Sequence, residues 1–157
     1  MLWPRTICAS WIRGVCSAGT LRAALENPTA PALDVRLPAV PGAASDARRA
    51  VHAVAAGRVA DGYAVALAVS EAVANVVVHA YRGRDADAEP GHVHVTVTIE
   101  GDELVVAVAD EGVGMTPRMD SPGAGLGLPI IAVLADRVEI QQLSGGTRLV
   151  LGFRLAS

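Results

Sequence analysis

Hydrophobic and polar residues alternate in several short segments of this chain. Residues 33–37 and 92–99 place an apolar side chain at every second position, which is the period of a strand with one buried face. Residues 104–110 form a more continuous apolar run, and a Gly-Asp turn signal separates it from the segment before it. Alternation returns in residues 137–142 and 147–154, around a Ser-Gly-Gly turn. The pattern therefore predicts one separate strand followed by two antiparallel hairpins.

Three other segments carry apolar residues at helical spacing. We expect a first helix that is capped by Ser45 or Asp46 and ends near residue 58, a second over residues 63–81, and a third over about 126–134. The apolar face of the first helix consists of Ala47, Val51, Val54 and Ala55. The broader apolar stripe of the second consists of Leu67, Val69, Val73, Val76, Val77 and Ala80.

The order of these elements indicates the fold class. Strands interleaved with three helices favour an α/β (α+β) two-layer sandwich, with a mixed, mostly antiparallel sheet and the helices on one face. We expect this domain to span residues 33–157. Residues 1–32 have the arginines of a targeting peptide but lack its apolar region and cleavage site. We therefore expect a disordered tail, which could arise from a start codon placed too far upstream.

Composition restricts the class of ligand. The 157 residues have a net charge of −3 and an aromatic content of 3%, which disfavours a nucleic-acid partner that needs basic and stacking side chains. No lysine occurs, so a P-loop is excluded and phosphate must be held by backbone N–H groups, arginine or a metal. Two cysteines and the absence of a membrane-length apolar run favour a cytoplasmic protein without a membrane partner.

The helix expected over residues 63–81 carries a line of polar side chains. Glu71, Asn75 and His79 are spaced i, i+4, i+8 and therefore project from nearly one line. Such a line is also typical of a solvated helix face. A carboxylate and an amide oxygen one turn apart suit a proton acceptor and a hard-cation ligand, respectively, but spacing alone does not decide between the two interpretations.

A first glycine-containing segment follows the most apolar strand. Asp110 ends that strand and precedes Gly112 and Gly114, where a ligand can approach the backbone because no Cβ intrudes. A carboxylate at this place can accept a hydrogen bond from the amino group of a base. An ordinary strand-to-loop turn is the alternative, since Asp-Glu-Gly is common turn chemistry.

A second glycine-rich segment opens the third expected helix. Gly123, Gly125 and Gly127 bring backbone N–H groups to a helix start, where the dipole favours phosphate. The segment is not a dinucleotide fingerprint, because no strand directly precedes it and its spacing is G-x-G-x-G.

His92 and His94 lie on the same face of their expected strand and could be taken for a metal pair. An exposed strand face is the more typical explanation, because no third ligand is nearby in the sequence.

Taken together, these segments resemble the GHKL ATPase/kinase superfamily, which has the Bergerat-type ATP-binding fold. The resemblance covers roughly residues 33–155: residues 70–81 resemble the N box, 110–115 the first glycine box and 123–128 the second, and Gly146-Thr147 is similar to the closing threonine. The small size and the pattern E-A-x-x-N-x-x-x-H-A-Y most resemble bacterial anti-sigma-factor serine kinases. Sensor histidine kinases share the boxes but carry a phosphoacceptor helix pair upstream.

The resemblance implies a role for each matching residue in a site for ATP and Mg²⁺. Asn75 would ligate the magnesium ion, Glu71 would orient or deprotonate the attacking hydroxyl, and Asp110 would bond the adenine amino group. A short lid over residues 115–123 would contribute Arg118 as the cation for the phosphates. The further nucleotide-binding residues would be His79, Gly112, Gly114, Met115, Gly123, Gly125, Leu126, Gly127, Leu128 and Thr147.

The resemblance also implies a function. The chain would be a protein serine/threonine kinase that phosphorylates a serine of an anti-anti-sigma factor and regulates a sigma factor, with a homodimer as a further expectation. The alternative is a non-catalytic ATP-binding module that controls partner binding. A structural α/β domain with accidental motifs is the third hypothesis.

Overall fold

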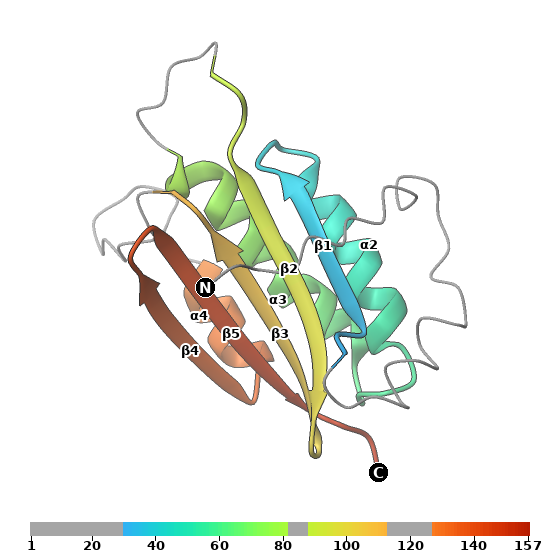
Figure 1. Ribbon diagram of the computed structural model, residues 1–157. Coiled ribbons are helices and arrows are strands. Elements are labelled where there is room, and N and C mark those ends of the chain that lie inside the picture. The colour runs from blue at the N-terminus through green and yellow to red at the C-terminus, as the bar shows by residue number, and fades with distance from the viewer. Residues whose placement is uncertain (1–29, 82–87, 113–126) are drawn as a thin grey trace.

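The computed structural model describes residues 30–81, 88–112 and 127–157 (Figure 1). Within these ranges one sheet of five strands has the order β1-β2-β3-β5-β4, and all four pairings are antiparallel. The strands are β1 (Leu33–Pro38), β2 (His92–Glu100), β3 (Glu103–Asp110), β4 (Arg137–Leu143) and β5 (Gly146–Arg154). The separate strand and the two predicted hairpins are therefore confirmed.

Helices cover one face of this sheet, as the two-layer prediction requires (Figure 1). They are α2 (Ala43–Ala55), α3 (Gly62–Asn75) and α4 (Gly127–Leu134), and α3 continues directly into a π-helical segment, η1 (Val76–Ala80). Helix α3 packs against both α2 and α4. Its position in the middle of the helical layer explains why its sequence is apolar around most of its circumference.

The core lies between the helices and alternate residues of the central strands. The strand residues that face it are Val93, Val95 and Val97 from β2, Leu104, Val106 and Val108 from β3, and Leu149, Leu151 and Phe153 from β5. Each fully buried side chain of this size stabilises the fold by roughly 1.5–3 kcal/mol. The predicted apolar face of α2 is fully buried. In α3 the prediction was wrong for Leu67, which is 43% exposed because neighbouring Ala66 and Ala68 take the buried positions.

Helix starts differ from those the sequence predicted. Helix α2 begins at Ala43 with Gly42 as its N-cap and has no side-chain cap, so the expected cap by Ser45 or Asp46 was wrong. Both residues lie in the first turn, where their N–H groups donate to the Gly42 carbonyl at 3.1 Å. Helix α3 is capped by Asp61, whose carboxylate accepts hydrogen bonds from the N–H groups of Tyr63 and Ala64.

The segment Gly62–Ala80 is long and apolar enough, by length and composition, to cross a membrane. This corrects the expectation that no apolar run approaches that length. The core helix of a globular domain meets the same criteria, and here the segment packs between α2, α4 and the sheet.

The described part of the chain starts slightly before the predicted domain boundary. Ala32 is buried, and its N–H donates to the Val97 carbonyl at 2.7 Å, so it already belongs to the packed domain. Residues 1–29 of the predicted tail lie outside the described residues.

Candidate functional site

Two predicted site residues lie on the last turns of α3. Glu71 and Asn75 are both half-buried and are separated by one α-helical turn, so their side chains emerge on the same side of a rigid element. A carboxylate and an amide oxygen held in this way can act on a common ligand.

His79 lies beyond the point where the helix changes character. Val76-Val77-Val78 begins the π-helical segment, and three successive β-branched residues disfavour regular α-helix. His79 lies within this π-helical segment and is half-buried, so Asn75 is the last of the three polar residues on the regular α-helix. Single π-turns inside α-helices are frequent at functional sites.

Asp110 ends β3 and is a buried acid, only 3% exposed. Its Oδ1 accepts a hydrogen bond from the Gly112 N–H at 2.9 Å. Its Oδ2 is buried and has no hydrogen-bond partner among the residues that the structure describes. Burial raises the pKa of the Asp110 carboxyl, and the backbone N–H groups of Gly112 and Thr147 lower it in part. An unpaired buried oxygen is uncommon and is a natural acceptor for a ligand donor.

The start of β5 lies beside the end of β3. Ala109 pairs with Arg148, which places Gly146 and Thr147 next to Asp110. Gly146 has φ +142°, and a Cβ at this position would lie 1.9 Å from the Asp110 carbonyl oxygen. Thr147 is fully buried. Glycine is therefore required here, because the two backbones touch.

Gly112 makes a second close backbone contact. A Cβ at this position would lie 2.0 Å from the Ala80 carbonyl oxygen, at the end of η1. From the sequence, we expected a glycine here because it lets a ligand approach the backbone. In the structure, the space beside its Cα is filled by Ala80. The contact fixes the loop after Asp110 to the segment that follows Asn75.

The second glycine segment is only partly described. Gly127 begins α4, and Leu128 is partly buried against the core. The remaining predicted site residues lie outside the described ranges: Gly114, Met115, Arg118, Gly123, Gly125 and Leu126.

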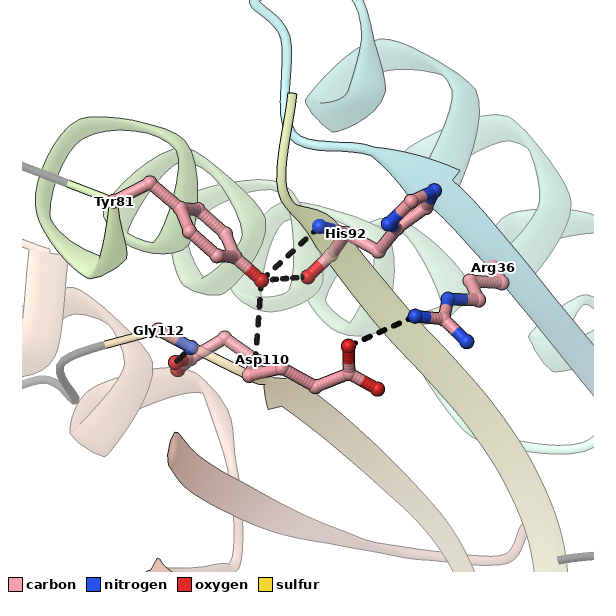
Figure 2. A network of polar contacts seen from close by, with 6 residues as sticks. Arg36, Tyr81, His92, Asp110 and Gly112 are labelled. Carbon is pink, nitrogen blue, oxygen red and sulfur yellow. Dashed lines mark hydrogen bonds and ion pairs between the residues drawn. The ribbon is translucent and has the colours of Figure 1, made fainter. Parts of the chain in front are cut away.

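A polar network that the sequence did not predict surrounds the residue after Asp110 (Figure 2). The Tyr81 hydroxyl accepts hydrogen bonds from the N–H groups of His92 at 3.0 Å and Glu111 at 3.1 Å, and it donates to the His92 carbonyl. Arg36 binds the Glu111 carboxylate at 2.8 Å. Tyr81 closes the E-A-x-x-N-x-x-x-H-A-Y pattern, but its partners are 11 and 30 residues away, so no local signal reveals them.

The histidine pair belongs to a strand face. His92 is exposed, whereas His94 is half-buried and lies 2.6 Å from an Asp34 carboxylate oxygen. Across the described residues, no group of three or more potential metal ligands occurs.

The sequence of this chain is similar to those of known proteins. Residues 37–153 match the family model described as the histidine kinase-like ATPase domain. The anti-sigma F factor of Clostridium beijerinckii is 31% identical over 99 residues, which cover 55% of this chain and 66% of that protein. The serine-protein kinase RsbW of Bacillus pumilus is 32% identical over 142 residues, which cover 77% of this chain and 85% of that protein.

A solved structure shares the fold. The crystal structure of the RsbU and RsbW domains of a Mycobacterium tuberculosis protein superposes on 80% of this chain with a TM-score of 0.58 and 25% sequence identity. The match covers 33% of that longer chain.

Proposed function

Because the chain belongs to the family of histidine kinase-like ATPase domains, we propose that it binds ATP and transfers phosphate to a serine of a partner protein. The likeness to an RsbW domain confirms the expected Bergerat-type fold of the GHKL superfamily. Two relatives are named anti-sigma F factor and serine-protein kinase RsbW, and these names support phosphate transfer to a serine in sigma-factor regulation.

Asp110 is the observation that carries the nucleotide part of this proposal. Its buried Oδ2 has no protein partner in the described ranges, while Oδ1 and the adjacent N–H groups hold the carboxyl in place. An adenine amino group would supply the missing donor, and a nucleobase without that group would leave the oxygen unpaired. This asymmetry favours adenine over guanine.

The chemistry of α3 suits the phosphate end of ATP. In our proposal Asn75 ligates Mg²⁺ through its amide oxygen, and Glu71 orients or deprotonates the serine hydroxyl. The metal supplies charge neutralisation at the phosphates when it is bound. Arg118 and the N–H groups at the start of α4, which begins at Gly127, complete the phosphate site. Positioning and electrostatics suffice for phosphoryl transfer, so the absence of lysine is compatible with it.

We assign the remaining predicted nucleotide contacts to the same site. They are His79, Gly112, Gly114, Met115, Gly123, Gly125, Leu126, Leu128 and Thr147. The name anti-sigma F factor of one relative supports a sigma factor as the regulated target. As the sequence resemblance implies, we further propose an anti-anti-sigma factor as the substrate, a cytoplasmic location and a homodimer.

Calorimetry with ATP, in the presence and absence of Mg²⁺, tests the nucleotide site. We expect saturable binding that Mg²⁺ strengthens. No detectable heat or thermal stabilisation with millimolar ATP would refute the proposed function at its first step.

Labelled ATP and candidate partners from the same genome test the transfer. We expect label on a serine with the wild-type protein, and loss of label with Glu71→Ala while ATP remains bound. If the wild-type protein binds ATP and a partner but mass spectrometry finds no phosphoserine, the non-catalytic regulatory module becomes the correct description. Equal labelling by Glu71→Ala would remove that carboxylate from the mechanism.

A further inference from the structure

Tyr81 connects three segments that are distant in the sequence. It directly follows η1, and its hydroxyl contacts the first residue of β2 and the first residue after β3 (Figure 2). The hydroxyl uses its full capacity, because it accepts two N–H groups and donates to one carbonyl. A side chain with three backbone bonds is a strong constraint on the backbone segments it joins.

The ring of Tyr81 is also fixed. It packs against the core cluster, and a Cβ on Gly91 would lie 2.2 Å from its ring carbons. The glycine therefore leaves the space that the ring occupies. With the ring held on one side and the hydroxyl bonded on the other, the position of the oxygen is determined by packing rather than by a flexible side chain.

The bond to Glu111 acts on the backbone next to the candidate adenine acceptor. The Glu111 N–H belongs to the peptide unit that joins Asp110 to Glu111, and Gly112, one residue later, contacts Ala80. Ala80 and Tyr81, at the end of η1 and directly after it, thus contact two successive residues that follow β3, Gly112 and Glu111. Both contacts limit the movement of the Asp110 carboxyl relative to the helix that carries Asn75.

We propose that Tyr81 is a positioning residue for adenine recognition, which holds the Asp110 carboxylate in register through the Glu111 N–H. This inference rests on the proposed ATP binding. It adds a specificity-determining residue that lies outside the nucleotide-contacting set and works through the backbone.

The ion pair between Arg36 and Glu111 also holds Glu111, but more weakly than the Tyr81 hydrogen bond does. The two side chains are 54% and 68% exposed, and pairs at such exposure contribute little because water and salt screen them. We expect Arg36→Gln to change nucleotide affinity by less than about twofold.

Nucleotide specificity provides the test. Calorimetry would compare ADP with IDP, which lacks the adenine amino group, on the wild-type protein and on Tyr81→Phe. ADP should bind about fivefold more weakly to the variant, which is the ratio produced by the net free energy of one hydrogen bond. IDP affinity should stay within about twofold, because IDP has a carbonyl oxygen in place of the amino group that is proposed to bond the Asp110 carboxylate.

Tyr63→Phe is the matched control. Tyr63 is 76% exposed, and its ring contacts His52 at an interplanar angle of 40° with 4.4 Å between centroids, so loss of its hydroxyl should change neither affinity. Equal weakening of ADP and IDP by Tyr81→Phe would show a merely structural role and overturn the inference, as would no change at all. A wild-type protein that binds neither nucleotide would instead refute the proposed function and this inference with it.

A second measurement does not depend on nucleotide or on the folding of a variant. In the free wild-type protein, the Glu111 amide should exchange with solvent deuterium at least about tenfold more slowly than in an unstructured peptide. Exchange at the unprotected rate would mean that the hydroxyl does not hold this N–H, and the inference would fail even if ATP binds.

Discussion

Replacing Asp110 by Asn should move stability and nucleotide affinity in opposite directions. The carboxyl is buried, and burial raises its pKa. Asn keeps an acceptor oxygen for the Gly112 N–H but carries no charge. The free protein is therefore relieved of a buried, unpaired anionic oxygen, while the acceptor proposed for adenine is lost.

The size of each change follows from the contacts. A buried oxygen without a partner costs about 1–3 kcal/mol, and the Asn amide that replaces it is unpaired as well but neutral. We therefore expect a gain in unfolding free energy of about 1 kcal/mol near neutral pH, which raises Tm by roughly 2–4 °C for a domain of this size. Loss of a hydrogen bond to a charged acceptor should weaken ADP binding by about 10- to 100-fold.

The stability of both proteins should depend on pH through the Asp110 carboxyl. A carboxyl whose pKa is raised in the folded state favours folding while it is protonated, and this contribution is lost as pH rises from its unfolded value of 3.8 through the folded value. The stability advantage of Asp110→Asn over wild type should therefore grow as pH rises from about 4 and level off only above the folded pKa.

Urea denaturation of both proteins between pH 4.5 and 8, with nucleotide titrations at pH 7.5, measures these quantities. The reasoning would be refuted if the Asn variant were less stable than wild type by a margin that does not change with pH. That result would mean that the ionised carboxylate is satisfied within the free protein.

Two further predictions concern the backbone near the site and the start of α3. Gly146→Ala should lower the free energy of unfolding by about 2 kcal/mol or more, because Gly146 has φ +142° and a Cβ there would meet the Asp110 carbonyl. Gly145→Ala is the control: its Cβ would meet nothing within 4 Å, so its stability in urea denaturation should lie within about 0.5 kcal/mol of wild type. Asp61→Ala should lower the free energy of unfolding by about 1 kcal/mol in the same assay, because Asp61 caps α3 with two hydrogen bonds at 2.9 and 3.0 Å. Asp46→Ala should cost less, because α2 has no side-chain cap. Equal losses for the two variants would contradict the assignment of Asp61 as a cap.

Period and turn signals determined the elements of this fold. Every predicted strand and helix is present, with bounds that shift by up to four residues when η1 is counted with α3, because alternation and helical spacing are local consequences of which face is buried. Local signals were weaker at the helix starts. The N-cap of α2 is Gly42 and not Ser45 or Asp46, and the cap of α3 by Asp61 was not predicted. They also did not reveal the π-turn after Asn75.

The sequence also named the residue types of the site, through Glu71, Asn75 and Asp110. It could not show that Asp110 is buried with one oxygen unpaired, since that depends on what packs around it. It did not show that close backbone contacts, to Ala80 and to Asp110 itself, leave no room for a side chain at Gly112 and Gly146.

Only the tertiary structure decided how these segments meet. The pairing of β3 with β5 brings Thr147 to Asp110, and the packing of η1 against the end of β3 brings the Tyr81 hydroxyl to Glu111. Periodicity records the environment of each residue relative to its own element, so it identifies faces and turns from the sequence alone. Register between distant strands and the burial of a single oxygen arise from long-range packing, which no local pattern encodes.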